Sequence, residues 1–177
     1  MSYHVGGSGG GLTAAAPPTR EEKTDAPRPA FGMGLGNGST TFFQPFVNLF
    51  TYGILERHPN LRFVLAESGT GWIPFVVQEM DYRYEQALER HPDERPLRHM
   101  PSEVFKRQVW ATYQQDRVGL SLIDFFGEGH MMWASDYPHP DSTWPNSRAI
   151  VEKETAHLPS NIRQQIIREN AKRFYRL

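Results

Sequence analysis

The strongest constraint on the fold is an alternation of short apolar runs with longer segments of helical periodicity. The runs at residues 62–66, 108–113 and 130–134 are continuous and largely apolar, as is typical of strands buried on both faces of a parallel sheet. A brief apolar start at residues 2–5 predicts one more strand. Strands that alternate with helices predict an α/β fold in which helices cover a parallel sheet.

The segments between these runs predict the helices and one long loop. Apolar side chains recur at helical spacing in six segments, which predicts helices at about 41–58, 71–90, from Ser102 onward, 115–126, 146–157 and 160–175. Residues 1–40 hold nine of the 15 glycines. We expect a flexible loop at about 7–40, serving as a lid or remaining disordered, within one domain that covers residues 1–177.

Composition excludes several classes of protein. A length of 177 residues fits one domain, and a net charge of −1 offers no basic surface for nucleic acid or an acidic membrane. The absence of cysteine excludes disulfides, thiolate metal sites and cysteine nucleophiles. No apolar stretch is long enough to span a membrane, and no signal peptide is recognisable. We expect a cytoplasmic protein that binds neither nucleic acid nor a membrane.

Ionisable residues follow the predicted strands, where parallel α/β folds place their reactive groups. His4, Glu67 and Asp136 each stand at a strand end, and His139 follows shortly after Asp136. An imidazole and a carboxylate can jointly hold Zn²⁺ or a similar divalent ion, so His4 and Asp136 are candidate ligands.

Each of these residues also has a structural alternative. A lone histidine such as His4 is more often solvated than a ligand, and Asp136 fits an Asx turn or a helix cap. Glu67 is a candidate general base or a cap of the following helix. His139 is a candidate for binding substrate or orienting Asp136, or an exposed histidine in a proline-containing turn.

Three segments resemble the amidohydrolase-related family of metal-dependent TIM barrels. They are the sequence Trp-Ala-Ser-Asp-Tyr-Pro-His-Pro at 133–140, the strand and following turn at 63–74, and the tail at 170–175. The resemblance implies that Asp136 and His4 are metal ligands. It also implies a hydrolase in which a divalent ion, for which zinc is the expected choice, activates water against a small-molecule substrate.

The same family includes non-oxidative decarboxylases, which gives an alternative activity. A histidine closes the sixth strand in that branch and acts in proton transfer, and Glu67 occupies the matching position here. In that alternative, the metal anchors a carboxylate-bearing substrate and Glu67 donates the proton.

Two features depart from the family pattern. The family's first strand carries a His-x-His ligand pair, and no His-x-His occurs in this chain. A (β/α)8 barrel also usually takes about 250 residues. We therefore expect a partial barrel, roughly strands five to eight, completed by a missing N-terminal half or by a homo-oligomer that covers the open sheet edges. An inactive remnant or interaction module is the alternative from another class.

Overall fold

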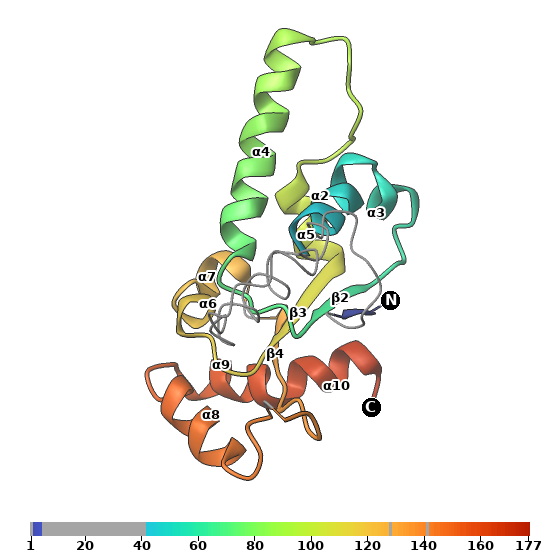
Figure 1. The fold of residues 1–177 in the computed structure, drawn as a ribbon. Helices are drawn as coiled ribbons and strands as arrows, with labels where there is room; N and C mark the ends of the chain where they lie inside the picture. The colour runs from blue at the N-terminus through green and yellow to red at the C-terminus, as the bar shows by residue number, and fades with distance from the viewer. Residues whose placement is uncertain (1, 5–41, 128, 141) are drawn as a thin grey trace, which may run out of the picture.

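The computed structural model describes residues 2–4, 42–127, 129–140 and 142–177 (Figure 1). The described strands form one parallel sheet in the order β1-β2-β3-β4. Their bounds are Ser2–His4 for β1, Phe63–Ala66 for β2, Val109–Tyr113 for β3 and Met131–Trp133 for β4. Each strand thus lies within one of the predicted runs, and the prediction of an α/β fold with a parallel sheet is confirmed. The loop predicted at about 7–40 lies outside the described residues.

The helices follow the predicted order with local differences. Their bounds are α2 Phe43–Thr51, α3 Ile54–Arg57, α4 Ile73–Arg90, α5 Pro101–Gln108, α6 Arg117–Ser121, α7 Ile123–Phe126, α8 Ser147–Thr155, α9 Ser160–Gln164 and α10 Asn170–Tyr175, with a π-helical stretch η2 at Gln165–Glu169. The helix expected at 41–58 is two helices, because Gly53 adopts a left-handed φ of 61° between them. The last helix contains a π-helical segment that periodicity alone does not reveal.

The strand order carries information about the architecture. Consecutive strands are neighbours, with His4 opposite Ala66, Phe63 opposite Val109 and Ala111 opposite Met131. In a doubly wound sheet the order of the strands reverses at a switch point, and the order of the described strands shows no such reversal. Because the described strands are parallel, their carboxyl ends all lie at the same end of the sheet.

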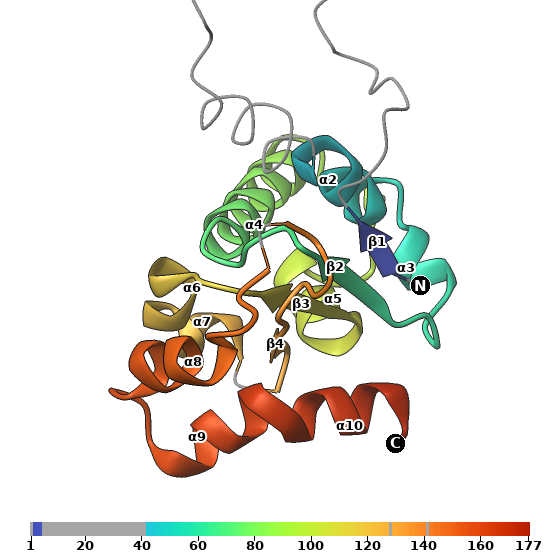
Figure 2. The same cartoon turned by 60° about the horizontal axis from the view of Figure 1, so that its bottom comes forward.

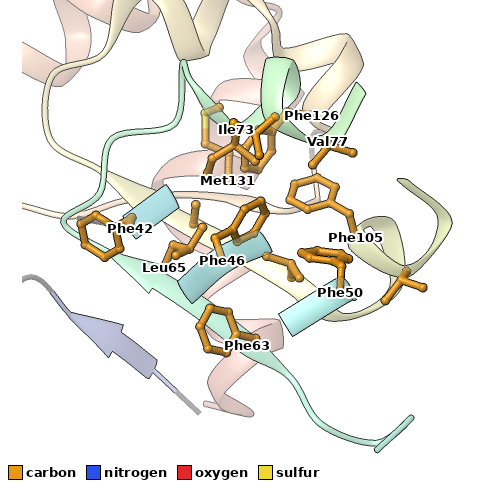
Figure 3. Packing of buried hydrophobic residues seen from close by; sticks show 14 of the residues in the cluster. Phe42, Phe46, Phe50, Phe63, Leu65, Ile73, Val77, Phe105, Phe126 and Met131 are labelled. Atoms are coloured by element: carbon orange, nitrogen blue, oxygen red, sulfur yellow. The ribbon is translucent and has the colours of Figure 1, made fainter. Parts of the chain in front are cut away.

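The helices pack on the sheet through a core rich in phenylalanine. Helices α2, α4, α5 and α7 contribute Phe46, Ile73, Phe105 and Phe126, which lie against strand residues such as Leu65 (Figure 3). Helix α4 buries one face because its apolar residues recur three or four positions apart, as a helix in contact with a sheet requires. This packing fixes the strands and the positions of their ends.

Aromatic side chains gather at the amino ends of β3 and β4. Trp110 and His130 meet there with Phe174 of α10 and the guanidinium of Arg62. The rings of Trp110 and His130 stack with centroids 4.8 Å apart, and Phe174 of α10 lies 5.0 Å from Trp110. The Arg62 guanidinium lies over the Trp110 ring at 5.8 Å. Figure 2 shows α9 and α10 running together along one side of the sheet, next to β4. Aromatic side chains therefore pack together at the amino ends of β3 and β4.

Helix length and polarity bear on the expected absence of a membrane span. Among the described residues, no helix has both the length and the apolar character needed to cross a bilayer.

Candidate metal centre

Glu67, Asp136 and His139 converge at the carboxyl end of the sheet. One possible ligand atom from each lies within 4.8 Å of the others. Glu67 directly follows β2, and Asp136 and His139 belong to the loop that follows β4. Residues far apart in the sequence thus form one group because parallel strands end at the same edge.

Glu67 and Asp136 share an uncommon backbone conformation. Their φ angles are 57° and 59°, in the left-handed region that costs a residue with a side chain roughly 1 to 2 kcal/mol. Such conformations persist only where the surroundings hold them, and they concentrate at functional sites. The chain therefore leaves β2 and β4 through two strained residues, Glu67 and Asp136, whose carboxylates lie close together.

Asp136 and His139 are in direct contact. The Nδ1 atom of His139 lies 3.1 Å from one Asp136 carboxylate oxygen and 3.2 Å from the other. The Asp136 side chain is 8% exposed, whereas that of His139 is 51% exposed. The backbone N–H of His139 also donates to the Asp136 carbonyl, at 2.9 Å. His139 is thus placed to orient the Asp136 carboxylate while one side of its ring faces solvent.

The loop that carries both residues is closed on itself. The Ser135 carbonyl accepts hydrogen bonds from the Ser142 hydroxyl at 2.8 Å and from the Thr143 backbone N–H at 3.0 Å. Tyr137 and Trp144 pack edge to face within it, and both are about two-thirds exposed. These bonds tie Ser142 and Thr143 to Ser135 beside the candidate site.

The structure places His4 by its backbone alone. His4 ends β1 and is paired with Ala66, the residue directly before Glu67. Its side chain lies outside what the structure describes, so the shared His4 and Asp136 site stays a prediction. By its sequence position, Glu67 is also a candidate cap of the following helix. The structure has Trp72, and not Glu67, at the N-cap position of α4.

Two residues of this region were not recognised as part of the site from the sequence. Thr112 accepts the backbone N–H of Glu67, at 3.1 Å. Asp116 contacts the loop that follows Glu67 and also caps α6 through the Gly119 N–H, at 2.8 Å. The spacing of an aspartate three residues before a helical N–H is the sequence signal that identifies the cap. Its contact with the neighbouring loop has no local signal.

The donor set is suited to a divalent cation. Two carboxylates and an imidazole match the ligands that zinc and manganese accept. Ligand atoms on one ion with bonds near 2 Å lie no more than about 4 Å apart, so small side-chain rotations would bring these three groups onto one ion. The residues present therefore fit a metal centre, built at the carboxyl ends of parallel strands of an α/β protein.

The chain belongs to the amidohydrolase family, whose family model, described as Amidohydrolase, matches residues 10–177. The family predicted from the resemblance is confirmed, and its members among the relatives below are enzymes.

Among curated proteins, the chain is 27% identical over 152 residues to 6-methylsalicylic acid decarboxylase acuB of Aspergillus aculeatus. The match covers 82% of this chain and 43% of the relative. The chain thus spans less than half the length of the curated relative that it matches. That relative has the activity we expected as the alternative, so hydrolysis is no better supported than decarboxylation.

Solved structures share the fold. The 5-carboxyvanillate decarboxylase LigW of Sphingomonas paucimobilis matches with a TM-score of 0.62 and 24% identity, over 85% of this chain and 42% of that one. LigW2 of Novosphingobium aromaticivorans matches with a TM-score of 0.64 and 16% identity, over 85% and 44% of the two chains. That structure holds manganese and a nitrobenzoic acid compound.

Proposed function

We propose that this chain carries the carboxyl-terminal part of the active site of a metal-dependent decarboxylase for aromatic carboxylic acids. The observation that supports this most is the cluster of Glu67, Asp136 and His139 at the strand ends, in a chain related to 6-methylsalicylic acid decarboxylase. The neighbours of similar fold include decarboxylases of substituted benzoic acids. Decarboxylation, rather than hydrolysis, is the activity that these relatives favour.

Asp136 and His4 are the ligands that we propose for the metal, with Glu67 and His139 beside them. When bound, a divalent ion supplies positive charge that holds the substrate carboxylate and stabilises the negative charge developing in the reaction. The nearly buried Asp136 carboxylate is suited to this ligand role. His139 would donate its Nδ1–H to Asp136 and so fix the orientation of that ligand.

Glu67 is the residue that we assign to proton transfer once substrate is bound; before that, its carboxylate charge, within 4.8 Å of Asp136, would add to the attraction for the metal ion. Loss of CO₂ breaks the bond between the carboxyl carbon and the ring and leaves the electron pair on the ring carbon. That carbon must then gain one proton, which the Glu67 carboxyl group would supply. Its place at the strand end, with a carboxylate oxygen within 4.8 Å of ligand atoms of Asp136 and His139, would put this proton beside the bound carboxylate.

The chain would form strands five to eight of a (β/α)8 barrel as one domain. Support comes from the sequential parallel order of β1 to β4 and from the share of the relatives' length that is matched. In the part of the chain that the structure describes, β1 and β4 are the outer strands of the sheet. We propose that a half-barrel with a His-x-His pair covers these edges, contributed by a preceding segment or a partner chain, and that the complete enzyme is a homo-oligomer.

The test is an assay of this chain joined to the N-terminal half of its Aspergillus relative. With Mn²⁺ and 6-methylsalicylic acid, we expect equal amounts of 3-methylphenol and CO₂, measured by liquid chromatography and gas analysis. Glu67→Gln and Asp136→Asn should each abolish the reaction, and Asp124→Asn on the exposed face of α7 should leave it unchanged. Aryl ester or amide hydrolysis without decarboxylation would instead support the hydrolase alternative. Inactivity of a folded joined protein would favour the remnant or interaction module.

A further inference from the structure

The end of β3 and the segment that joins it to α6 both make hydrogen bonds to the segment that follows β2. The hydroxyl oxygen of Thr112 accepts the Glu67 backbone N–H, at 3.1 Å. Thr112 is the fourth residue of β3, so it reaches across the sheet to the neighbouring strand at the point where that strand ends. The backbone of Glu67 is thus held by a side chain, just where its φ turns left-handed.

Asp116 holds the next few residues of the same segment. Its Oδ2 atom accepts hydrogen bonds from the Thr70 N–H at 2.5 Å, the Thr70 hydroxyl at 2.8 Å and the Gly71 N–H at 2.8 Å. Its Oδ1 atom accepts the Gly119 N–H of α6, at 2.8 Å. One carboxylate therefore ties the turn after Glu67 to the first turn of α6.

The two segments approach so closely that only glycine fits at the contact. A Cβ atom on Gly119 would lie 1.8 Å from the Thr70 hydroxyl oxygen, and one on Gly71 would lie 2.9 Å from the Cβ of Val118. Real Cβ atoms essentially never come this close to another heavy atom. The spacing between the segments is consequently fixed by both hydrogen bonds and packing.

We propose that Thr112 and Asp116, which together we name the clamp, are positioning residues for Glu67. The clamp contacts the backbone on both sides of the Glu67 side chain and directs its carboxylate toward Asp136. This inference rests on the proposed function, because it assigns the clamp to the metal and proton-transfer site.

The physical reason lies in the conformation that Glu67 adopts. A left-handed φ is unfavourable for glutamate because its Cβ crowds the backbone, so an unrestrained chain would favour another region. A change of φ at Glu67 would swing its side chain away from Asp136. Loss of a group that orients a metal-site residue typically costs 10- to 100-fold in metal affinity or activity.

The test uses Mn²⁺ alone as the probe, in the joined protein described above, with free Mn²⁺ measured by electron paramagnetic resonance. Thr112→Val keeps the shape of the side chain and removes the acceptor, and we expect Mn²⁺ affinity to fall about 10-fold or more. Thr112→Ser restores the hydroxyl and should restore the affinity. Thr155→Val is the matched control, because Thr155 is buried and its hydroxyl bonds the Val151 carbonyl within α8.

Asp116→Asn is the second variant and keeps the size of the side chain. Its amide offers one acceptor oxygen, so either the Thr70 and Gly71 bonds or the Gly119 bond is lost. We expect Asp116→Asn to lower Mn²⁺ affinity more than Thr155→Val does. The comparison is made at conditions in which the two variants show the same change of melting temperature relative to the wild type.

The outcomes separate this inference from the proposed function. If Glu67→Gln and Asp136→Asn leave Mn²⁺ binding unchanged, the metal site and the clamp are both wrong. If those two variants weaken binding while Thr112→Val and Asp116→Asn lower only the melting temperature, the clamp is merely structural and the proposed function stands. Failure of Thr112→Ser to restore the affinity would likewise overturn the positioning role.

Discussion

The two ends of the sheet carry different kinds of side chain. At the carboxyl end, Glu67 and Asp136 take left-handed conformations, and their carboxylates meet with His139. At the amino end, Trp110 and His130 stack, Phe174 packs against Trp110, and the His130 Nδ1 lies 2.7 Å from the Val109 carbonyl. One end holds strained polar groups, and the other holds stacked rings with satisfied hydrogen bonds.

This difference leads us to expect that the carboxyl end serves the chemistry and that the amino end serves stability. In barrel enzymes, residues at the carboxyl ends of the strands serve catalysis, whereas those at the amino ends serve stability. Strain at Glu67 and Asp136 lowers stability and is offset by packing elsewhere. Substitutions at the carboxyl end should therefore change metal binding, and substitutions at the amino end should change only the free energy of unfolding.

Asp136→Asn should have the largest effect on the site. Asparagine keeps the size of the side chain but lacks the negative charge that attracts a cation, so Mn²⁺ affinity should fall more than about 100-fold, beyond the range for orienting residues. Isothermal titration with Mn²⁺ measures this on the joined protein. The melting temperature of the metal-free protein should change little, because asparagine keeps the shape of the side chain and still offers an acceptor oxygen to His139. Unchanged affinity would remove the carboxyl end from metal binding.

Phe105→Ala should have the largest effect on stability. Phe105 is 2% exposed, and its ring packs edge to face on Phe126 at 5.2 Å and lies 6.2 Å from the His130 ring at the amino end. Truncating a buried phenylalanine costs about 3 to 5 kcal/mol, through lost burial and a residual cavity. Urea unfolding measures the loss, with the milder Phe105→Leu as the matched control. A Mn²⁺ affinity that falls in the folded variant would break the division between the two ends.

Sequence patterns predict the strands and most helices because apolar periodicity reports burial directly. The runs around Phe63, Val109 and Met131 were recognised for this reason. The break at Gly53 and the π-helical stretch at Gln165–Glu169 depend on single backbone conformations and shifted hydrogen bonds, which leave periodicity almost unchanged.

The site was predictable in its residues but not in its geometry. Placement at strand ends identified Glu67, Asp136 and His139, and the structure brings these three together. Whether they bind metal, and whether His4 joins them, stays a prediction. The contacts of Thr112 and Asp116 join residues about 45 positions apart. Such long-range hydrogen bonds depend on strand neighbourhood, which local spacing does not contain.

His130 should make the amino end sensitive to pH. Burial lowers the pKa of His130, and the nearby Arg173 charge adds to this, against the raising effect of the Val109 hydrogen bond. Because the pKa is lower in the folded than in the unfolded state, the unfolded state binds more protons below the ordinary value near 6.5. The stability from His130 is thus fully present above that value and is lost as the pH falls toward the folded pKa.

The check compares urea unfolding at pH 7.5 and pH 5.5. Wild-type protein should lose stability on acidification, and His130→Asn should lose less, since asparagine can donate to Val109 without titrating. His91→Asn, at an exposed position, is the matched control and should follow the wild type. An equal loss in all three proteins would mean that groups other than His130 cause the acid sensitivity.

Glu56→Gln should have the smallest effect and tests whether a charge away from the carboxyl ends of the strands acts on stability alone. The Glu56 carboxylate accepts the backbone N–H groups of Arg98 and His99 and the His99 ring nitrogen, at 2.8 to 3.1 Å. Burial alone would raise the pKa of Glu56, but these hydrogen bonds outweigh it and lower the pKa below 4.5.

The sign of its pH dependence follows from that lowered pKa. The unfolded state binds more protons as the pH approaches 4.5, so the stability from Glu56 is present above this value and is lost as the pH falls through the folded pKa. Glutamine keeps one acceptor oxygen, so the variant should lose about 1 to 2 kcal/mol at pH 7 and become less sensitive to acid below pH 4.5. Thermal unfolding from pH 3.5 to 7 measures both effects, with the exposed Glu89→Gln on α4 as the control. Mn²⁺ affinity should not change, because Glu56 contacts the segment that leads into α5 and not the carboxyl ends of the strands.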